Sequence, residues 1–182
     1  MGMPNNLLLT GVSGVGKSTV LTEAAELLKP RAISGFLSPR TTGAGSQSGW
    51  LIEGFNGVSG LVADPSITST LNMGAFGVDM ELFNRCVDVE MASFVGSDLV
   101  MIDEIGIIGG WSQRFQAYVT RVLDDTIPVV AIIRSESGVF SDQIKLRNDV
   151  ELWTVTEQNR SSLAGDIASW VNGVKAFDAN KA

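Results

Sequence analysis

Short apolar runs alternate with longer amphipathic stretches along the chain. Runs with the length and composition of buried strands lie at residues 6–10, 32–37, 99–102, 128–133 and 150–155. Between them, apolar residues recur at helical spacing and predict helices over residues 17–29, from Asp79 to Phe94, around 115–123 and over 161–171. Strands that alternate with helices favour an α/β fold, in which a mostly parallel sheet carries helices on both faces.

One region departs from this alternation. Residues 50–55 and 60–63 have strand composition, and Asn56-Gly57 between them is a hairpin-type turn. We therefore expect an antiparallel portion of the sheet after the second strand, followed by irregular structure over residues 64–76. The small polar residues 41–49 form either a plain connection or a mobile loop that closes over a ligand. No repeat or linker divides the chain, which predicts one domain over residues 1–182.

The first strand runs directly into a glycine-rich loop. Residues 11–18 match the pattern G-x-x-x-x-G-K-[ST] of the phosphate-binding loop called Walker A. Its glycines let backbone N–H groups point inward, and the following helix N-terminus adds partial positive charge. Lys17 supplies a cation for the β- and γ-phosphates, and the hydroxyl of Ser18 is a candidate Mg²⁺ ligand. The candidate phosphate-binding residues are Gly11, Val12, Ser13, Gly14, Val15, Gly16, Lys17, Ser18 and Thr19.

The apolar run 99–102 ends in two acidic residues, Asp103 and Glu104. Ligands of open parallel sheets bind at this carboxyl end of the strands. Downstream of a complete Walker A motif, the arrangement favours a Walker B strand, in which Asp103 holds Mg²⁺ and Glu104 polarises the attacking water. Gly106 completes a D-x-x-G spacing, which predicts its N–H close to the γ-phosphate, where a side chain would block the approach.

Composition narrows the classes of protein and of chemistry. The chain has 45% hydrophobic and 18% charged residues, as in ordinary soluble proteins, and its net charge of −7 argues against nucleic-acid or anionic-membrane binding. No apolar run approaches the roughly 18 residues of a membrane span. The single cysteine, Cys86, fits a cytoplasmic protein. The absence of histidine excludes His-based triads and His-liganded zinc. We expect a cytoplasmic monomer.

Several further segments occur in the order seen in one known family. Besides Walker A, these are Gly35-Phe36-Leu37-Ser38, Gly49-Trp50, Asp103-Glu104-Ile105-Gly106, Ser112 with Phe115, and Asn159-Arg160. The chain thereby resembles the small P-loop nucleoside-triphosphatases of THEP type. The resemblance implies a three-layer P-loop fold, similar to RecA-like and nucleotide-kinase-like sheets. It also implies slow, Mg²⁺-dependent hydrolysis of the β–γ bond of ATP, GTP and other nucleoside triphosphates, with Arg160 near the nucleotide.

The chain departs from the pattern of that family at three places. Pro39-Arg40 stand where the family has a Glu and an Arg, Gln47 or a neighbour replaces an Arg before Gly49, and Ile108-Gly109 replace a Met-Glu pair. Arg40 and Arg134 are candidates for stabilising negative charge in the transition state, because an added arginine is effective in phosphoryl transfer. Either arginine is equally consistent with a plain surface position.

Three classes of function use such a phosphate-binding site. The first is hydrolysis of nucleoside triphosphates, with Lys17, Glu104 and Arg40 as catalytic residues. The second is a nucleotide or small-metabolite kinase with a hydroxyl acceptor, and the third is a nucleotide-dependent switch or adaptor. Glu104 directly after Asp103 suits water activation, no Arg-rich lid is evident, and the chain lacks an N-K-x-D motif for guanine. The sequence therefore predicts a hydrolase.

Overall fold

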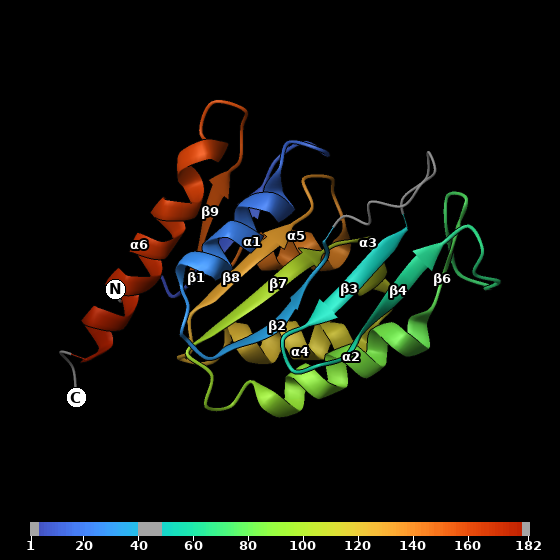
Figure 1. Cartoon of the computed structure of the whole chain (residues 1–182), viewed down its shortest axis with the longest axis horizontal. Coiled ribbons are helices and arrows are strands. Elements are labelled where there is room, and N and C mark those ends of the chain that lie inside the picture. The colour runs from blue at the N-terminus through green and yellow to red at the C-terminus, as the bar shows by residue number, and fades with distance from the viewer. Residues whose placement is uncertain (1–3, 40–48, 180–182) are drawn as a thin grey trace.

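A single mixed sheet forms the centre of the computed structural model, which describes residues 4–39 and 49–179. The strands are β1 (Asn6–Thr10), β2 (Ile33–Leu37), β3 (Trp50–Gly54), β4 (Ser59–Asp64), β5 (Asn72–Met73), β6 (Phe76–Val78), β7 (Leu99–Ile105), β8 (Val129–Ile133) and β9 (Val150–Thr154). In the described ranges their order is β5-β6-β4-β3-β2-β7-β8-β1-β9 (Figure 1). The strands β2, β7, β8, β1 and β9 are parallel, and the remaining strands pair antiparallel. The predicted α/β sheet with an antiparallel portion is confirmed.

Helices cover both faces of the sheet. They are α1 (Lys17–Leu27), α2 (Met80–Ser93), α3 (Ile107–Trp111), α4 (Gln113–Leu123), α5 (Val139–Lys145) and α6 (Arg160–Ala179). Helices α2 and α4 pack on one face and α1 and α6 on the other. Each face of the sheet therefore has its own hydrophobic core. Because side chains along a strand alternate in direction, Leu8 of β1 packs in the core with α2 and α4, whereas Leu7 and Leu9 pack in the core with α1 and α6. None of the helices in the described ranges has the length and apolar character that a membrane crossing requires.

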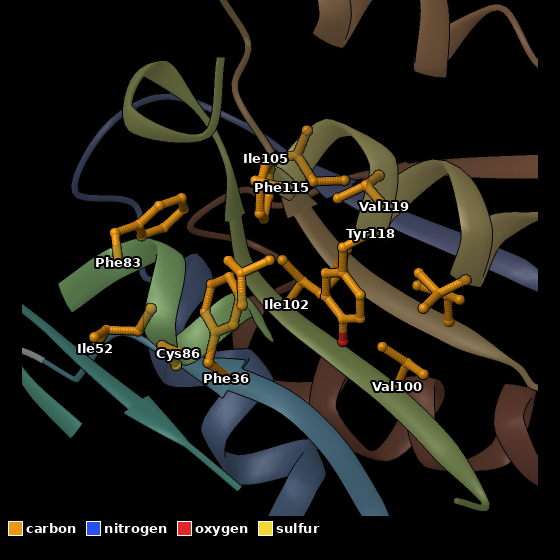
Figure 2. Packing of buried hydrophobic residues seen from close by; sticks show 14 of the residues in the cluster. Phe36, Ile52, Phe83, Cys86, Val100, Ile102, Ile105, Phe115, Tyr118 and Val119 are labelled. Atoms are coloured by element: carbon orange, nitrogen blue, oxygen red, sulfur yellow. The ribbon is translucent and has the colours of Figure 1, made fainter. Parts of the chain in front are cut away.

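Three aromatic side chains fix the packing of α2 and α4 on β2. The ring centroids of Phe36, Phe83 and Phe115 lie 5.4–6.1 Å apart, within the range of favourable aromatic pairs (Figure 2). Phe36 and Phe115 come from two of the segments that carry the family resemblance. In the structure both side chains therefore pack in the core. Ser112 caps α4, because its hydroxyl accepts a hydrogen bond from the Phe115 N–H at the start of that helix.

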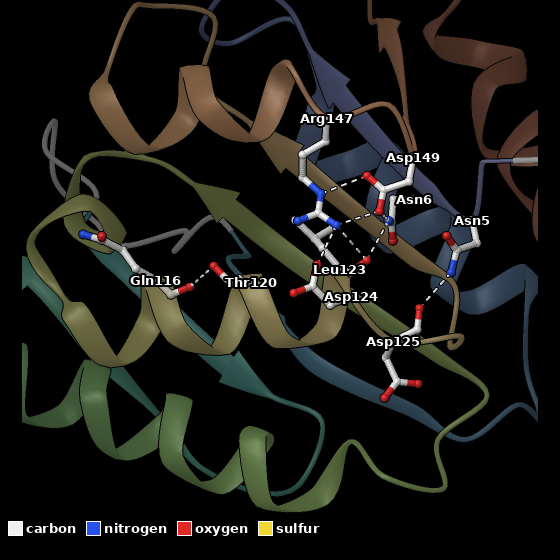
Figure 3. A network of polar contacts seen from close by, with 9 residues as sticks. All are labelled: Asn5, Asn6, Gln116, Thr120, Leu123, Asp124, Asp125, Arg147 and Asp149. Atoms are coloured by element: carbon white, nitrogen blue, oxygen red, sulfur yellow. Dashed lines mark hydrogen bonds and ion pairs between the residues drawn. The ribbon is translucent and has the colours of Figure 1, made fainter.

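Arg147 joins three elements at the amino-terminal end of the parallel strands, opposite the phosphate loop. It bonds to Asp149 before β9, to Asp124 at the end of α4 and to the Leu123 carbonyl, while the Asn6 amide donates to Leu123 and Asp149 (Figure 3). The paired charges raise the pKa of Arg147 and lower the pKa of Asp149. This network fastens the edge of the sheet without reaching the phosphate loop.

Four short elements lie in stretches that the sequence pattern left irregular. The strands β5 and β6 form a hairpin within and just beyond residues 64–76, and α3 and α5 follow Gly106 and Gly138. Each is at most seven residues long, so no periodic pattern develops. The strand β7 also continues through Asp103 and Glu104 to Ile105. Leu27 shares the helical spacing of the buried Val20, Leu21 and Ala24 of α1, which predicts a core position, but it is 60% exposed.

Candidate active site

The two predicted motifs meet at the carboxyl end of the parallel strands. The Walker A loop joins β1 to α1, and Asp103 and Glu104 end β7. Strand β8 lies between β1 and β7 in the sheet, so the acidic residues face the loop across one intervening strand. The β7–β8 register shifts between Ile102 and Ile105, where the Asp103–Glu104 peptide bond is cis.

The loop backbone has the conformation that an anion site needs. Gly11, Gly14 and Gly16 adopt φ values of 147°, 78° and 110°, which side chains rarely allow. Helix α1 begins after Gly16 with no side-chain cap, so its first N–H groups remain available to a phosphate. The Lys17 ammonium lies over the loop and donates to the carbonyls of Gly11 and Val12 at 2.8 and 3.1 Å.

The other loop residues divide between core and surface. Val15 is buried and packs in the core beneath α1, so only its backbone is available to a ligand. Val12, Ser13, Gly14 and Thr19 are exposed.

Asp103 is a buried carboxylate held beside the loop, with 6% of its surface exposed. Burial raises the pKa of Asp103 to about 6, and the nearby Glu104 charge adds to the rise, whereas the Ser18 hydroxyl, the Ser38 backbone and Lys17 oppose it. The two residues predicted to hold a metal ion, Ser18 and Asp103, line the same cavity.

Glu104 lies next to Asp103 in a half-buried position among charged groups. Burial is the main cause that raises its pKa, the Glu136 charge adds to the rise, and Lys17 and Arg134 lower it. Gly106 lies against this carboxylate: a Cβ at Gly106 would stand 2.3 Å from Glu104 Oε1. Gly106 thus leaves the space that the Glu104 side chain occupies. This is a different reason for a glycine here from the predicted one, which was that its N–H approaches the γ-phosphate closely.

Arg160 lies on the opposite side of the loop. Its guanidinium donates to the Val15 carbonyl at 3.2 Å, and its Cδ would be 3.6 Å from a Cβ at Gly16. Asn159 places it there, because its amide closes the β9–α6 connection by bonding to the Thr154 carbonyl and the Thr156 N–H. The Asn-Arg pair therefore connects the last strand to the phosphate loop.

Two cavities adjoin at the reacting centre. We call the first the phosphate-side cavity; it measures about 310 Å³ and is lined by Ser13, Gly14, Gly16, Lys17, Ser18 and Thr19 of the loop, together with Asp103 and Glu104. We call the second the apolar cavity; it measures about 400 Å³. Its apolar walls include Phe36, Trp50, Ile52, Val62, Phe83 and Ile108. Both cavities are bounded by Ser13, Lys17, Ser38, Trp50, Asp103 and Glu104.

Of the remaining residues that the sequence analysis singled out, some lie at the apolar cavity and others lie outside the described residues. Arg134, which follows β8, lines the apolar cavity. Ile108 and Gly109, which replace the Met-Glu pair of the family, line it too. Arg40 and Gln47 lie outside the described residues. The apolar cavity itself was not predicted, because its walls come from β2, β3, β4, α2 and the segment after β7, which only the folded sheet brings together.

A family model described as NTPase matches residues 6–168 of the chain. The chain belongs to this NTPase family. Among its relatives, nucleoside-triphosphatase THEP1 of Thermotoga sp. (strain RQ2) is 33% identical over 164 residues, which cover 90% of this chain and 93% of that protein. The human cancer-related nucleoside-triphosphatase is 28% identical over 188 aligned positions, with 93% of this chain and 97% of that protein covered.

Solved structures of the NTPase family have the same fold. The crystal structure of THEP1 from the hyperthermophile Aquifex aeolicus superposes with a TM-score of 0.81 at 24% identity and covers 91% of this chain and 98% of that one. The solution structure of a human cancer-related nucleoside triphosphatase gives a TM-score of 0.77 at 25% identity, with 92% and 97% covered. The family expected from the motifs and the P-loop fold are both confirmed.

Proposed function

We propose that this NTPase hydrolyses nucleoside 5'-triphosphates to the diphosphate and phosphate, with Mg²⁺ and with broad nucleotide specificity. The observation that carries the proposal is the phosphate-side cavity, in which a cation and free helix amides face two carboxylates. The comparisons support the proposal, because relatives that align over most of their length are named nucleoside-triphosphatases. A phosphate-binding loop, a cation and a carboxylate beside it are the groups that in-line attack of water on a γ-phosphate uses.

Binding rests on the loop. The N–H groups at the start of α1 and the Lys17 ammonium bind the β- and γ-phosphates and neutralise charge that moves to the leaving diphosphate. Arg160 beside Gly16 contacts the nucleotide from the outer side of the loop, at its base, sugar or phosphates.

The donor set suits Mg²⁺. The Ser18 hydroxyl and the buried Asp103 carboxylate line the same cavity, and hard oxygen donors of this kind hold Mg²⁺ together with substrate phosphates and water. When bound, the ion neutralises charge on the phosphate oxygens.

Glu104 is the residue that we assign to the water. Burial raises its pKa, which makes the carboxylate a better proton acceptor than a free glutamate side chain. It lines the phosphate-side cavity together with Lys17 and Asp103, and Gly106 leaves room for its side chain. Arg134, which lines the adjoining cavity, and Arg40 are proposed to stabilise the transferring phosphoryl group.

The NTPase is also proposed to act in the cytoplasm as a monomer. Cys86 is buried, and burial raises the pKa of its thiol to about 12, so the thiol is suited to packing rather than to disulfide chemistry.

Phosphate release from ATP, GTP, CTP and UTP tests this function directly. With Mg²⁺ and no acceptor, the wild type is expected to release phosphate from all four, and EDTA to abolish release. Lys17→Ala should lower kcat/KM by at least about a hundredfold, because the cation stabilises transition-state charge. The matched control is Lys145→Ala, a lysine of α5 outside both cavities, with unchanged rates expected. Tight nucleotide binding without phosphate release by the wild type would refute hydrolysis.

A further inference from the structure

We propose that the apolar cavity binds a second substrate, an alcohol with an apolar body, whose hydroxyl accepts the γ-phosphoryl group in place of water. The inference rests on the proposed function, because it takes the nucleotide to occupy the phosphate-side cavity. It adds a phosphotransferase activity, and it names the chemical class of the acceptor.

The size of the apolar cavity exceeds what hydrolysis requires. A water molecule fills roughly 30 Å³, whereas the cavity measures about 400 Å³, within the range of small-molecule sites. Its inner wall consists of Phe36, Ile52, Val62 and Phe83, which are at most 5% exposed and are held by core packing. Two further lining side chains, Trp50 and Ile107, are large and apolar and are 43% and 40% exposed. Such an apolar lining fits an organic body.

The sheet order separates the apolar walls of this cavity from Arg160. Arg160 and the β9–α6 connection lie beside β1, on the side of the loop where we place the nucleotide. The apolar walls include residues of β2, β3 and β4 on the far side of β7, whereas Gly11, Ser13 and Lys17 of the phosphate loop line the polar end of the cavity. A nucleotide held in this way presents its phosphates, and not its base, to the apolar cavity.

Polar groups occur where the acceptor hydroxyl would meet the phosphate. Lys17, Asp103 and Glu104 bound both cavities, so an occupant of one is adjacent to an occupant of the other. Arg134 lines the apolar cavity, and its buried Nε makes no hydrogen bond among the described residues; its nearest acidic partner is Glu136 Oε2 at 3.8 Å. A donor without a hydrogen-bond partner is available to an oxygen of the acceptor or of the transferred group.

The transfer step balances without a further reactant. The acceptor oxygen forms a bond to the γ-phosphorus while the bond from this phosphorus to the β–γ bridging oxygen breaks. The electron pair of the broken bond leaves on the nucleoside diphosphate. Glu104 takes the proton of the acceptor hydroxyl, as it takes that of water in hydrolysis, and the products are a phosphate monoester and the diphosphate.

A series of primary alcohols tests the proposal. The enzyme is given γ-³²P-labelled ATP and Mg²⁺ with ethanol, 1-butanol or 1-hexanol at equal concentration, and the ratio of alkyl phosphate to inorganic phosphate is measured. These alcohols share one nucleophile and differ only in apolar length. An apolar acceptor site predicts that the ratio rises roughly twofold or more per added methylene, because each buried methylene favours binding.

Two variants locate the effect. Ile108→Phe adds volume at the wall of the apolar cavity and should flatten the dependence of the ratio on chain length. Leu146→Phe, at a side chain that is 82% exposed and outside the cavity, should keep it. A flat wild-type series with normal phosphate release would overturn the acceptor site and leave hydrolysis standing. Formation of neither inorganic phosphate nor alkyl phosphate from the labelled ATP would overturn the proposed function and the acceptor site together.

Discussion

Gly106 leaves room for the side chain of Glu104, the residue that we propose activates the attacking water. A methyl group there would stand 2.3 Å from Glu104 Oε1, closer than such atoms approach, so the Glu104 carboxylate must turn away. We expect Gly106→Ala to lower kcat about tenfold or more in the phosphate-release assay, because misplaced catalytic groups lose much of their effect.

The neighbouring helix offers a matched control for this substitution. A Cβ at Gly110, in the same short helix α3, meets nothing within 4 Å. Gly110→Ala should therefore keep kcat within about twofold of the wild type, since it adds the same methyl group without displacing a neighbour. Equal rates for the two variants would contradict the positioning role of Gly106.

At the scale of elements, a single buried carboxylate connects α2 to the sheet. Glu90 is fully buried and accepts hydrogen bonds from the Gly35 N–H of β2 and from the backbone and side-chain N–H groups of Asn56 in the β3–β4 turn, at 2.7–2.8 Å. Glu90→Ala leaves these donors unpaired inside the protein and should lower the free energy of unfolding by about 3 kcal/mol.

Denaturant unfolding monitored by circular dichroism measures this loss. Glu81→Ala, on the exposed side of the first turn of α2, removes the same side chain without buried partners and should change the free energy by less than about 0.5 kcal/mol. If Glu90→Ala is as stable as Glu81→Ala, Glu90 does not fasten the elements.

The long elements could be predicted because pattern and function agree in them. Leu7-Leu8-Leu9 is apolar on both faces since helices cover both, and the predicted helix begins at Asp79, whose side chain caps α2 by accepting a hydrogen bond from the Leu82 N–H at 2.8 Å. The short elements could not be predicted. The five residues of α3 are Ile-Ile-Gly-Gly-Trp, whose two glycines disfavour a helix, and its packing against α4 and β7 outweighs that preference.

The candidate active site also has parts that the sequence predicts and parts that it does not. The loop, Asp103 and Glu104 lie on contiguous motifs, so sequence alone predicts their neighbourhood, although their individual roles remain predictions. The apolar cavity and the buried Glu90 depend on contacts between segments far apart in the chain, such as Gly35 with Glu90. No local pattern in a single sequence marks such contacts.

At the scale of the whole molecule, the Arg147 network makes stability depend on pH. The hydrogen bond from Arg147 lowers the pKa of Asp149 in the folded protein. A carboxyl whose folded pKa is lowered stabilises the fold above its unfolded pKa, near 3.9, and loses this contribution as the pH falls through the folded pKa. We expect Asp149→Asn to cost about 1 kcal/mol at pH 7 for a partly exposed network.

The cost should shrink toward zero as the pH is lowered from about 4 through the folded pKa, because the wild-type carboxyl is then also uncharged. Urea unfolding of both proteins across this range measures it. A difference in unfolding free energy that stays constant down to the acid end would show that charge is not its cause. Phosphate release should be unaffected at pH 7, since the network lies at the opposite end of the strands.

In the proposed mechanism, a carboxylate near the end of β7 activates water for a nucleotide that is held by the loop after β1. The most direct test of this mechanism is single-turnover hydrolysis of Mg²⁺-ATP by Glu104→Gln, which keeps the size of the side chain and removes the proton acceptor. We expect nucleotide affinity within about threefold of the wild type and hydrolysis slower by about a hundredfold or more, with Glu23→Gln, at an exposed glutamate of α1 outside both cavities, close to the wild type. Hydrolysis by Glu104→Gln at the wild-type rate would contradict the mechanism.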